Sequence, residues 1–349
     1  MAISPRPPAN GFVRVARKVY NPIGFSRGYN FTLWFIFAGA LMGFILARLM
    51  YLDYHGIYCS TDPEDSGPNA AAPGECWTYN QKEHLQVGIR MHLYTIIPAG
   101  FLVCFQFVPA IRRKVLLFHR INGYVVVFLS LAGTIGALMI AKVAFGGGVD
   151  TQAAVGFLAI VFLGSLAISY YNIKKLQIEQ HRAWMLRAWF YAGAIITNRL
   201  ILVISALITS QDDSYHTAMK CDKLGSFYDS AEAFQVAYPS CTSPDAYAIV
   251  KDGMSGSSEN FGAALYKSFG MALWLALSIH AIGVEIYLQL TPAEYERLRN
   301  ISYQRQLEAG FKNPGRAGLT VDRLGDSAAW VPSSVNDSGK AVSTENAEA

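Results

Sequence analysis

Six long apolar stretches limit most strongly what this chain can fold into. A helix needs about 20 mostly apolar residues to cross the ~30 Å hydrocarbon core of a bilayer, and each stretch reaches that length. Each is one continuous run without the alternation of outer-membrane strands, so helices must satisfy its backbone groups in lipid. The sequence therefore predicts an all-α integral membrane bundle of about six transmembrane helices. The predicted spans cover residues 31–52, 88–108, 121–142, 153–172, 188–209 and 262–290.

The composition also indicates a membrane protein. Hydrophobic residues make up 52% of the chain and charged residues 15%, against roughly 25% charged residues in soluble domains. The formal net charge is +4, and the basic residues lie in short clusters between apolar runs. They form no stripe interleaved with aromatic residues. We therefore expect membrane lipids as partners and no nucleic acid.

Lys and Arg in the connections between spans predict the orientation. They cluster in the N-terminal tail and in the second-to-third and fourth-to-fifth connections, whereas the other connections are acidic or glycine-rich. We expect the basic segments to face the cytosol, and an even number of spans returns the C-terminus to that side. The basic residues concerned are Arg14, Arg17, Lys18, Arg27, Arg112, Arg113, Lys114, Arg120, Lys174, Lys175, Arg182 and Arg187.

Four of the five cysteines lie in the two long connections predicted to face outward. Because disulfides persist in oxidising compartments, we predict two disulfides there, although four cysteines allow three pairings. Pairing within each loop joins Cys59 to Cys76 and Cys221 to Cys241. Cys104 is predicted to be buried in a span. The outer cysteines favour the plasma membrane or an endomembrane.

The two ends of the chain differ from its membrane part. Residues 1–30 are predicted to be a cytosolic N-terminal tail, and residues 31–290 the six-span domain. Residues 291–312 are charged and amphipathic, which predicts a short cytosolic helix on the membrane surface. Residues 313–349 are predicted to be disordered, because they offer little apolar area to offset the entropy of ordering.

Titratable side chains inside the predicted spans are the main functional candidates: His92, Arg199, His280 and Glu285. With a rise of about 1.5 Å per residue, the first three could converge near the midplane. Glu285 is rotated away from His280 and is expected to pair with a neighbouring helix. One interpretation is a substrate-binding site formed by all four. The alternatives are a haem held by opposed histidines and plain helix packing.

Two His-Arg motifs each open a predicted span: HRINGY from His119 and HRAWMLR from His181. Their parallel positions suggest two helical hairpins that present a His-Arg pair at one membrane face. Arg120, Arg182 and Arg187 are predicted to bind lipid phosphate there. His119 and His181 would anchor the helix starts, or serve as a second ligand pair or a site for an anionic headgroup or cofactor.

From about His92 to Ser205 the chain resembles a family of predicted multi-pass membrane proteins, found in bacteria and fungi, whose domain has no assigned function. The resemblance rests on residues in order: His92, the QFVPAIRRK turn at 106–114, His119-Arg120 with Gly123, HRAWMLR from His181, and Arg199. A looser similarity is to transmembrane b-type cytochromes that hold two haems between four helices. It implies haem b bound by His92, His280, His119 and His181.

The sequence is compatible with three classes of function. The main prediction is a multi-pass membrane protein whose polar site binds a small molecule or lipid. The alternatives are a haem-dependent electron-transfer protein and a structural or accessory membrane subunit. The sequence contains no GxxxxGKS phosphate loop, GxSxG elbow or HExxH zinc signature, so it assigns no catalytic residue and no metal, and leaves enzyme activity undecided.

Overall fold

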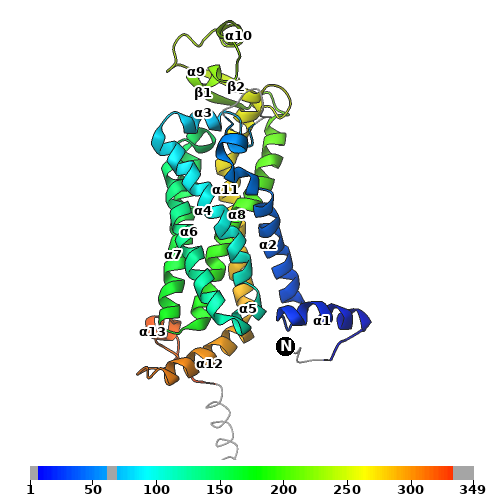
Figure 1. Ribbon diagram of the computed structural model, residues 1–349, viewed down its shortest axis with the longest axis vertical. Coiled ribbons are helices and arrows are strands. Elements are labelled where there is room, and N and C mark those ends of the chain that lie inside the picture. The colour runs from blue at the N-terminus through cyan, green and yellow to red at the C-terminus, as the bar shows by residue number, and fades with distance from the viewer. Residues whose placement is uncertain (1–6, 61–68, 333–349) are drawn as a thin grey trace, which may run out of the picture. The chain divides into compact units, whose positions relative to one another are not determined.

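The computed structural model describes residues 7–60 and 69–332 of the chain (Figure 1). Within these residues six helices are long and apolar enough to cross a membrane, and each overlaps a predicted span. The prediction of an all-α membrane bundle is thus confirmed. The six are α2 (Gly28–Leu46), α4 (Glu83–Gln106), α6 (Leu116–Ile140), α7 (Val149–Lys174), α8 (Ile178–Thr209) and α11 (Ser258–Gln289).

Several helices extend beyond the apolar windows that predicted them, because a helical backbone does not stop where the hydrophobic run stops. The helix α8 begins at Ile178 and therefore contains the whole HRAWMLR motif. Likewise α6 contains HRINGY, so His119 and His181 lie within the first turns of their helices. The first span behaves differently, because its helix ends before the apolar run does. The helix α2 ends at Leu46, and a short 3₁₀ helix, η1, follows.

Shorter elements precede, connect and follow these helices. They are α1 (Gly11–Ile23), η1 (Leu49–Leu52), η2 (Tyr54–Tyr58), α3 (Glu75–Asn80), α5 (Pro109–Lys114), η3 (Ala144–Gly147), β1 (His216–Lys220), α9 (Cys221–Gly225), α10 (Ala231–Ala237), β2 (Tyr247–Lys251), α12 (Pro292–Glu308) and α13 (Val321–Leu324). The strands β1 and β2 pair antiparallel, with His216 opposite Lys251 and Lys220 opposite Tyr247. The sequence predicts only a loop here, because two five-residue strands carry little signal of their own.

The chain divides into two compact units. Among the described residues, unit 1 comprises 7–60, 69–157 and 195–276, and unit 2 comprises 158–194 and 277–332. In unit 1 the hairpin with α9 and α10 lies at the opposite end from α1 and α5 (Figure 1). We call these the hairpin end and the α5 end of unit 1.

The helices α4 and α6 pack closely in unit 1 because glycines line their contact. A Cβ atom on Gly136 would lie 2.6 Å from both the carbonyl oxygen of Gly88 and the backbone nitrogen of His92. Only glycine allows the two backbones to approach this closely, as small residues do between membrane helices. The same contact holds His92, whose Nδ1 donates to the Gly133 carbonyl oxygen at 2.8 Å.

Two disulfides stabilise the hairpin end of unit 1, as the sequence predicted. Cys59 bonds to Cys76, with Cα atoms 5.3 Å apart, and Cys221 bonds to Cys241, with Cα atoms 5.5 Å apart. Cys104 is free and buried. Pairing therefore occurs within each loop, which was one of the three possible connectivities.

Helices also form in the segments that precede and follow the six-span region. The predicted N-terminal tail contains α1, which is capped by the Asn10 side chain and ends at Gly24 in a left-handed conformation. After α11, the helix α12 occupies most of the predicted amphipathic segment. Residues 313–332, predicted to be disordered, include α13, in which Asp322 is buried. The remainder of that predicted tail, residues 333–349, lies outside the described residues.

Candidate functional site

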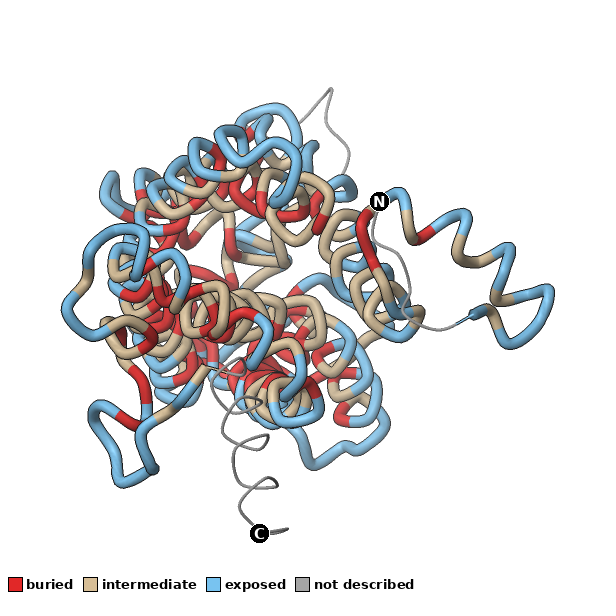
Figure 2. Tube along the Cα trace, turned by 90° about the horizontal axis from the view of Figure 1, so that it is seen from below, coloured by how far each residue is buried: buried red, intermediate tan, exposed pale blue. Residues whose placement is uncertain are grey.

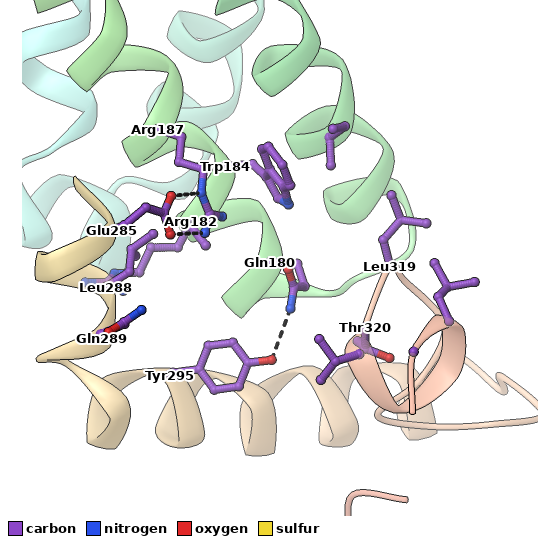
Figure 3. Close-up of a pocket in the computed structure, with 15 residues that line it drawn as sticks. Gln180, Arg182, Trp184, Arg187, Glu285, Leu288, Gln289, Tyr295, Leu319 and Thr320 are labelled. Atoms are coloured by element: carbon purple, nitrogen blue, oxygen red, sulfur yellow. Dashed lines mark hydrogen bonds and ion pairs between the residues drawn. The ribbon is translucent and has the colours of Figure 1, made fainter. Parts of the chain in front are cut away.

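A cavity of about 600 Å³ in unit 2 is the candidate site (Figure 3). Its walls come from the end of α7, the start of α8, the end of α11, the helix α12 and the residues around α13. Part of the second His-Arg motif and the predicted site residue Glu285 therefore line one cavity. Its volume lies within the range of about 300–1,000 Å³ that is usual for small-molecule sites.

An ion pair forms the charged wall of this pocket. The Nε and Nη2 atoms of Arg187 donate to the two carboxylate oxygens of Glu285 at 2.6 and 2.9 Å. The guanidinium also lies 4.6 Å from the centre of the Trp184 ring, which fixes its plane. Glu285 on α11 thus has its partner on a neighbouring helix, in line with its predicted direction.

Hydrogen bonds position the other polar side chains of the pocket. Arg182 donates to the Tyr287 hydroxyl at 3.3 Å, and its guanidinium lies 5.7 Å from the centre of that ring. Gln180 donates through Nε2 to the Tyr295 hydroxyl at 3.0 Å, which joins α8 to α12 (Figure 3). These contacts keep cationic and amide groups at the cavity wall without filling the cavity.

Apolar side chains form much of the remaining wall, including Leu288 from α11 and Leu319 and Leu324 from the segment around α13. Figure 3 shows Leu319 on the other side of the cavity from Glu285. The pocket is therefore amphipathic: its charged groups lie on one side, and aliphatic groups lie beside them at Leu288 and across the cavity at Leu319. Such an arrangement suits a ligand that has one polar end and one apolar part.

A buried polar network holds the segment before α13 in place. The Leu319 amide donates to the Asn172 side-chain oxygen at 2.8 Å, and the Gly318 amide donates to Gln177 Oε1 at 2.9 Å. A Cβ atom on Gly318 would lie 2.5 Å from the Asn172 oxygen, so a larger residue does not fit. Gln306 on α12 also donates to Gln177 Oε1 at 2.9 Å. The apolar wall is thus attached to the α7–α8 turn.

A second set of contacts fastens α13 to α12. Asp322 accepts a hydrogen bond from Arg299 at 2.5 Å and lies 3.1 Å from the Nε of Arg316. Burial alone would raise the pKa of Asp322, but hydrogen bonds from Arg299 and the Trp330 amide outweigh burial and hold this pKa below its ordinary value. The carboxylate is therefore charged at neutral pH and ties the segment to the helix.

The other predicted residues of unit 2 lie outside the cavity lining. The Nδ1 of His280 donates to the Phe190 carbonyl oxygen at 2.7 Å, and the His280 ring is 3.5 Å from where a Cβ on Gly193 would be. His181 makes a 2.8 Å contact through Nδ1 with the Ser169 hydroxyl. Both histidines thus have hydrogen bonds that join neighbouring helices.

In unit 1, Arg199 lies over two aromatic rings. Its guanidinium carbon is 5.0 Å from the centre of the Phe145 ring and 5.5 Å from that of Phe269. The two rings stack with their centroids 4.0 Å apart. Phe145 has a φ of 48°, in the left-handed region that side chains other than glycine rarely adopt. Arg199 is therefore held by cation–π contacts, which the spacing of charges in the sequence could not reveal.

The first His-Arg motif contributes to packing between α4 and α6. The Asn122 side chain donates to the Leu102 carbonyl oxygen at 3.0 Å, and the Gln106 side chain donates to the His119 carbonyl oxygen at 3.1 Å. Each predicted pair of haem ligands has one histidine in each unit, namely His92 with His280 and His119 with His181. Haem binding therefore stays a prediction.

Glu75 was not among the predicted site residues, because it lies in one of the acidic connections that the sequence predicts to face outward. The side chain is buried, and its Oε2 accepts hydrogen bonds from the Tyr79 hydroxyl at 2.5 Å and the Phe145 amide at 3.2 Å. The Lys223 ammonium lies 3.9 Å from its Oε1. Burial raises the pKa of Glu75 and lowers the pKa of Lys223, and each charge opposes the shift of the other. Its neighbour Cys76 was the only sequence signal of an ordered site here.

Comparisons with known proteins identify a matching family and one relative. Residues 89–221 match the family described as Predicted membrane protein (DUF2306). The family resemblance is confirmed. The matched region contains both His-Arg motifs and Arg199. No solved structure matches the chain.

A curated relative extends the similarity beyond that region. It is the "Ava biosynthesis cluster protein G" of Aspergillus versicolor, which is 24% identical over 344 residues. The alignment covers 83% of this chain and 97% of the fungal protein. The similarity thus includes much of the chain outside the family's domain.

Proposed function

We propose that this multi-pass membrane protein binds an amphipathic small molecule or lipid in the unit 2 pocket. The observation that carries the proposal is the cavity of about 600 Å³ with the Arg187–Glu285 pair on one side and aliphatic side chains on the other. The pair is partly exposed, with Arg187 at 20% and Glu285 at 45% of side-chain area. A ligand headgroup can therefore reach it from the cavity.

The charges of the pocket define the class of ligand. Its charged lining residues are Arg182, Arg187 and Glu285, whose formal charges add up to +1. Within the described residues Arg182 forms no ion pair with a carboxylate, and its hydrogen bond goes to the Tyr287 hydroxyl. Guanidinium groups bind phosphate and carboxylate well because their donors match the geometry of these anions. The ligand we propose has one such anionic group and an apolar part.

We also propose that the pocket faces the cytosol. The basic residues of the connections support this orientation, because Lys and Arg accumulate in short cytosolic connections. The disulfide-bonded loops follow α2 and α8, at the helix ends opposite to those basic connections. A cytosolic pocket at the membrane surface would admit a ligand from the inner leaflet.

Photo-crosslinking of the full-length protein in lipid nanodiscs tests the proposal. The probes are a diazirine fatty acid and a diazirine phosphatidic acid, which differ in the anion that they carry. We expect crosslinks on residues 319–325, competition by the unlabelled compound, and a preference that identifies carboxylate or phosphate. Arg182→Gln should weaken binding about tenfold, because one charge-assisted hydrogen bond is lost. Leu319→Trp should nearly abolish crosslinking by filling the cavity.

A matched control is Arg297→Gln on α12. It removes an exposed ion pair with Glu294, and neither residue lines the cavity. Crosslinking equal in wild type, Leu319→Trp and Arg297→Gln would reject the pocket and leave an accessory role. A visible spectrum of the same samples tests the haem alternative: a Soret band that weakens in His92→Ala would support electron transfer instead.

A further inference from the structure

The N-terminal helix α1 leaves an apolar face uncovered. Phe12, Val15 and Val19 are 81%, 61% and 55% exposed. At about 100° per residue these three positions fall within an arc of about 60° on the helix surface. Only Tyr20 of this helix is buried, and the trace beside the N label in Figure 2 is mostly exposed. Such a continuous apolar stripe is expected to be covered in the working protein.

The opposite face of α1 is basic. Arg14, Arg17 and Lys18 span an arc of about 100° whose centre lies about 140° from that of the apolar stripe, by the same helical geometry. No Asp or Glu occurs in residues 1–52 or 84–149 of the sequence. The connection between α4 and α6 adds Arg112, Arg113 and Lys114 at the end of α5. The charged residues of α1 and α5 at the α5 end of unit 1 are therefore all positive.

Contacts within unit 1 fix the direction of α1. The Tyr20 ring lies 5.8 Å from the Phe31 ring, and Phe25 lies 5.4 Å from Trp34, both on α2. Arg113 of α5 donates a hydrogen bond to the Gly24 carbonyl oxygen at the end of α1. Gly24 has a φ of 104°, which lets the chain turn sharply there. In Figure 1, α1 extends across the end of the membrane helix α2.

We propose that α1 is an in-plane membrane helix that binds the surface of a bilayer containing anionic lipids. Its apolar stripe would enter the boundary between headgroups and acyl chains, while its basic face would meet lipid phosphates. Two observations favour a lipid surface over a second copy of the chain. First, α1 lies beside the end of a membrane helix. Second, the sequence around α1 contains no Asp or Glu, so the same region of a second copy would offer no acidic partner for the basic face.

The test uses full-length protein in nanodiscs, with Cys104 replaced by alanine so that a single introduced thiol can be labelled. A fluorophore is attached to Val15→Cys on the apolar stripe, or to Arg14→Cys on the basic face as the matched control. We expect doxyl lipids to quench the label at position 15 and aqueous iodide to quench the label at position 14. Replacing phosphatidylcholine with a mixture containing phosphatidylserine should strengthen lipid quenching at position 15.

The charge dependence is tested by adding Arg17→Gln and Lys18→Gln to the Val15→Cys protein. Each basic residue near an anionic surface contributes about 1 kcal/mol, so each change should lower the docked-to-undocked ratio about fivefold. Equal iodide quenching at positions 14 and 15 would reject the proposal. So would a label at position 15 that neither iodide nor doxyl lipid quenches, since a protein partner would then cover the stripe.

Discussion

At the scale of single residues, Glu75 shows how one carboxylate can join distant parts of a chain. It lies beside the Cys59–Cys76 disulfide, and its oxygens meet Tyr79, the Phe145 amide and Lys223. These partners come from three different connections at the hairpin end of unit 1. Gly74 allows this approach, because a Cβ there would lie 2.5 Å from the Lys223 side chain. Burying a charge is costly unless its partners compensate it.

We predict that Glu75→Ala destabilises the protein strongly. The change would leave the Tyr79 hydroxyl, the Phe145 amide and the Lys223 ammonium buried without their acceptor. The expected loss is about 3–5 kcal/mol in the free energy of unfolding, measured by thermal unfolding in detergent micelles. Glu75→Gln should cost less, because an amide oxygen can still accept from both donors.

The matched control for this experiment is Asp245→Ala. Asp245 is 90% exposed and lies 3.0 Å from Lys220 in the same outer segment, so its loss should cost less than about 1 kcal/mol. An unfolding curve for Glu75→Ala that coincides with that of Asp245→Ala would show that Glu75 does not hold these loops together.

At the scale of elements, the segment around α13 closes one side of the pocket without being a stable element alone. The helix α13 has only four residues, too few for an isolated helix in water. Its order comes from tertiary contacts of Asn172, Gln177 and Arg299, which lie on α7, the following turn and α12. Loss of those contacts should release the segment while the membrane helices stay folded.

We predict that acid weakens this attachment through Asp322. Its folded pKa lies below the unfolded value, so its stabilising contribution is complete above the unfolded pKa and disappears as pH falls through the folded pKa. Hydrogen exchange in residues 313–325, corrected for intrinsic rates, should therefore accelerate on acidification. Asp322→Asn should give fast exchange at neutral pH and flatten the pH dependence.

Glu308→Gln serves as the control for that measurement, since its ion pair with Arg305 lies exposed on α12. It should exchange like the wild type at every pH. Retained protection in Asp322→Asn would contradict the role that we assign to the Asp322 carboxylate.

At the scale of the whole molecule, six spans place successive connections on alternate sides of the membrane. Val236 on α10 follows the fifth span and is 83% exposed, whereas Leu307 on α12 follows the sixth span and is 52% exposed. We predict that a membrane-impermeant maleimide labels Val236→Cys from outside intact cells or from the lumenal side of vesicles. Leu307→Cys should react only after permeabilisation. Labelling of both from one side would contradict the six-span topology.

The sequence alone determined the parts of this protein that depend on local composition. Hydrophobic length predicts all six membrane helices, because crossing a bilayer requires about 20 apolar residues whatever the helix packs against. The position of four cysteines in two outer loops predicted two disulfides, and pairing within each loop joins cysteines only 17 and 20 positions apart. The same reasoning missed α13, whose order depends on distant residues.

Which polar groups meet depends on how the helices and loops pack. Glu285 pairs with Arg187, 98 positions earlier, and Glu75 meets the Phe145 amide, 70 positions later. The periodicity of a helix gives the direction of a side chain but not the neighbour that it faces. Partners of buried charges are therefore chosen by packing, because a charge in a low-dielectric interior is stable only beside donors that the fold brings from elsewhere.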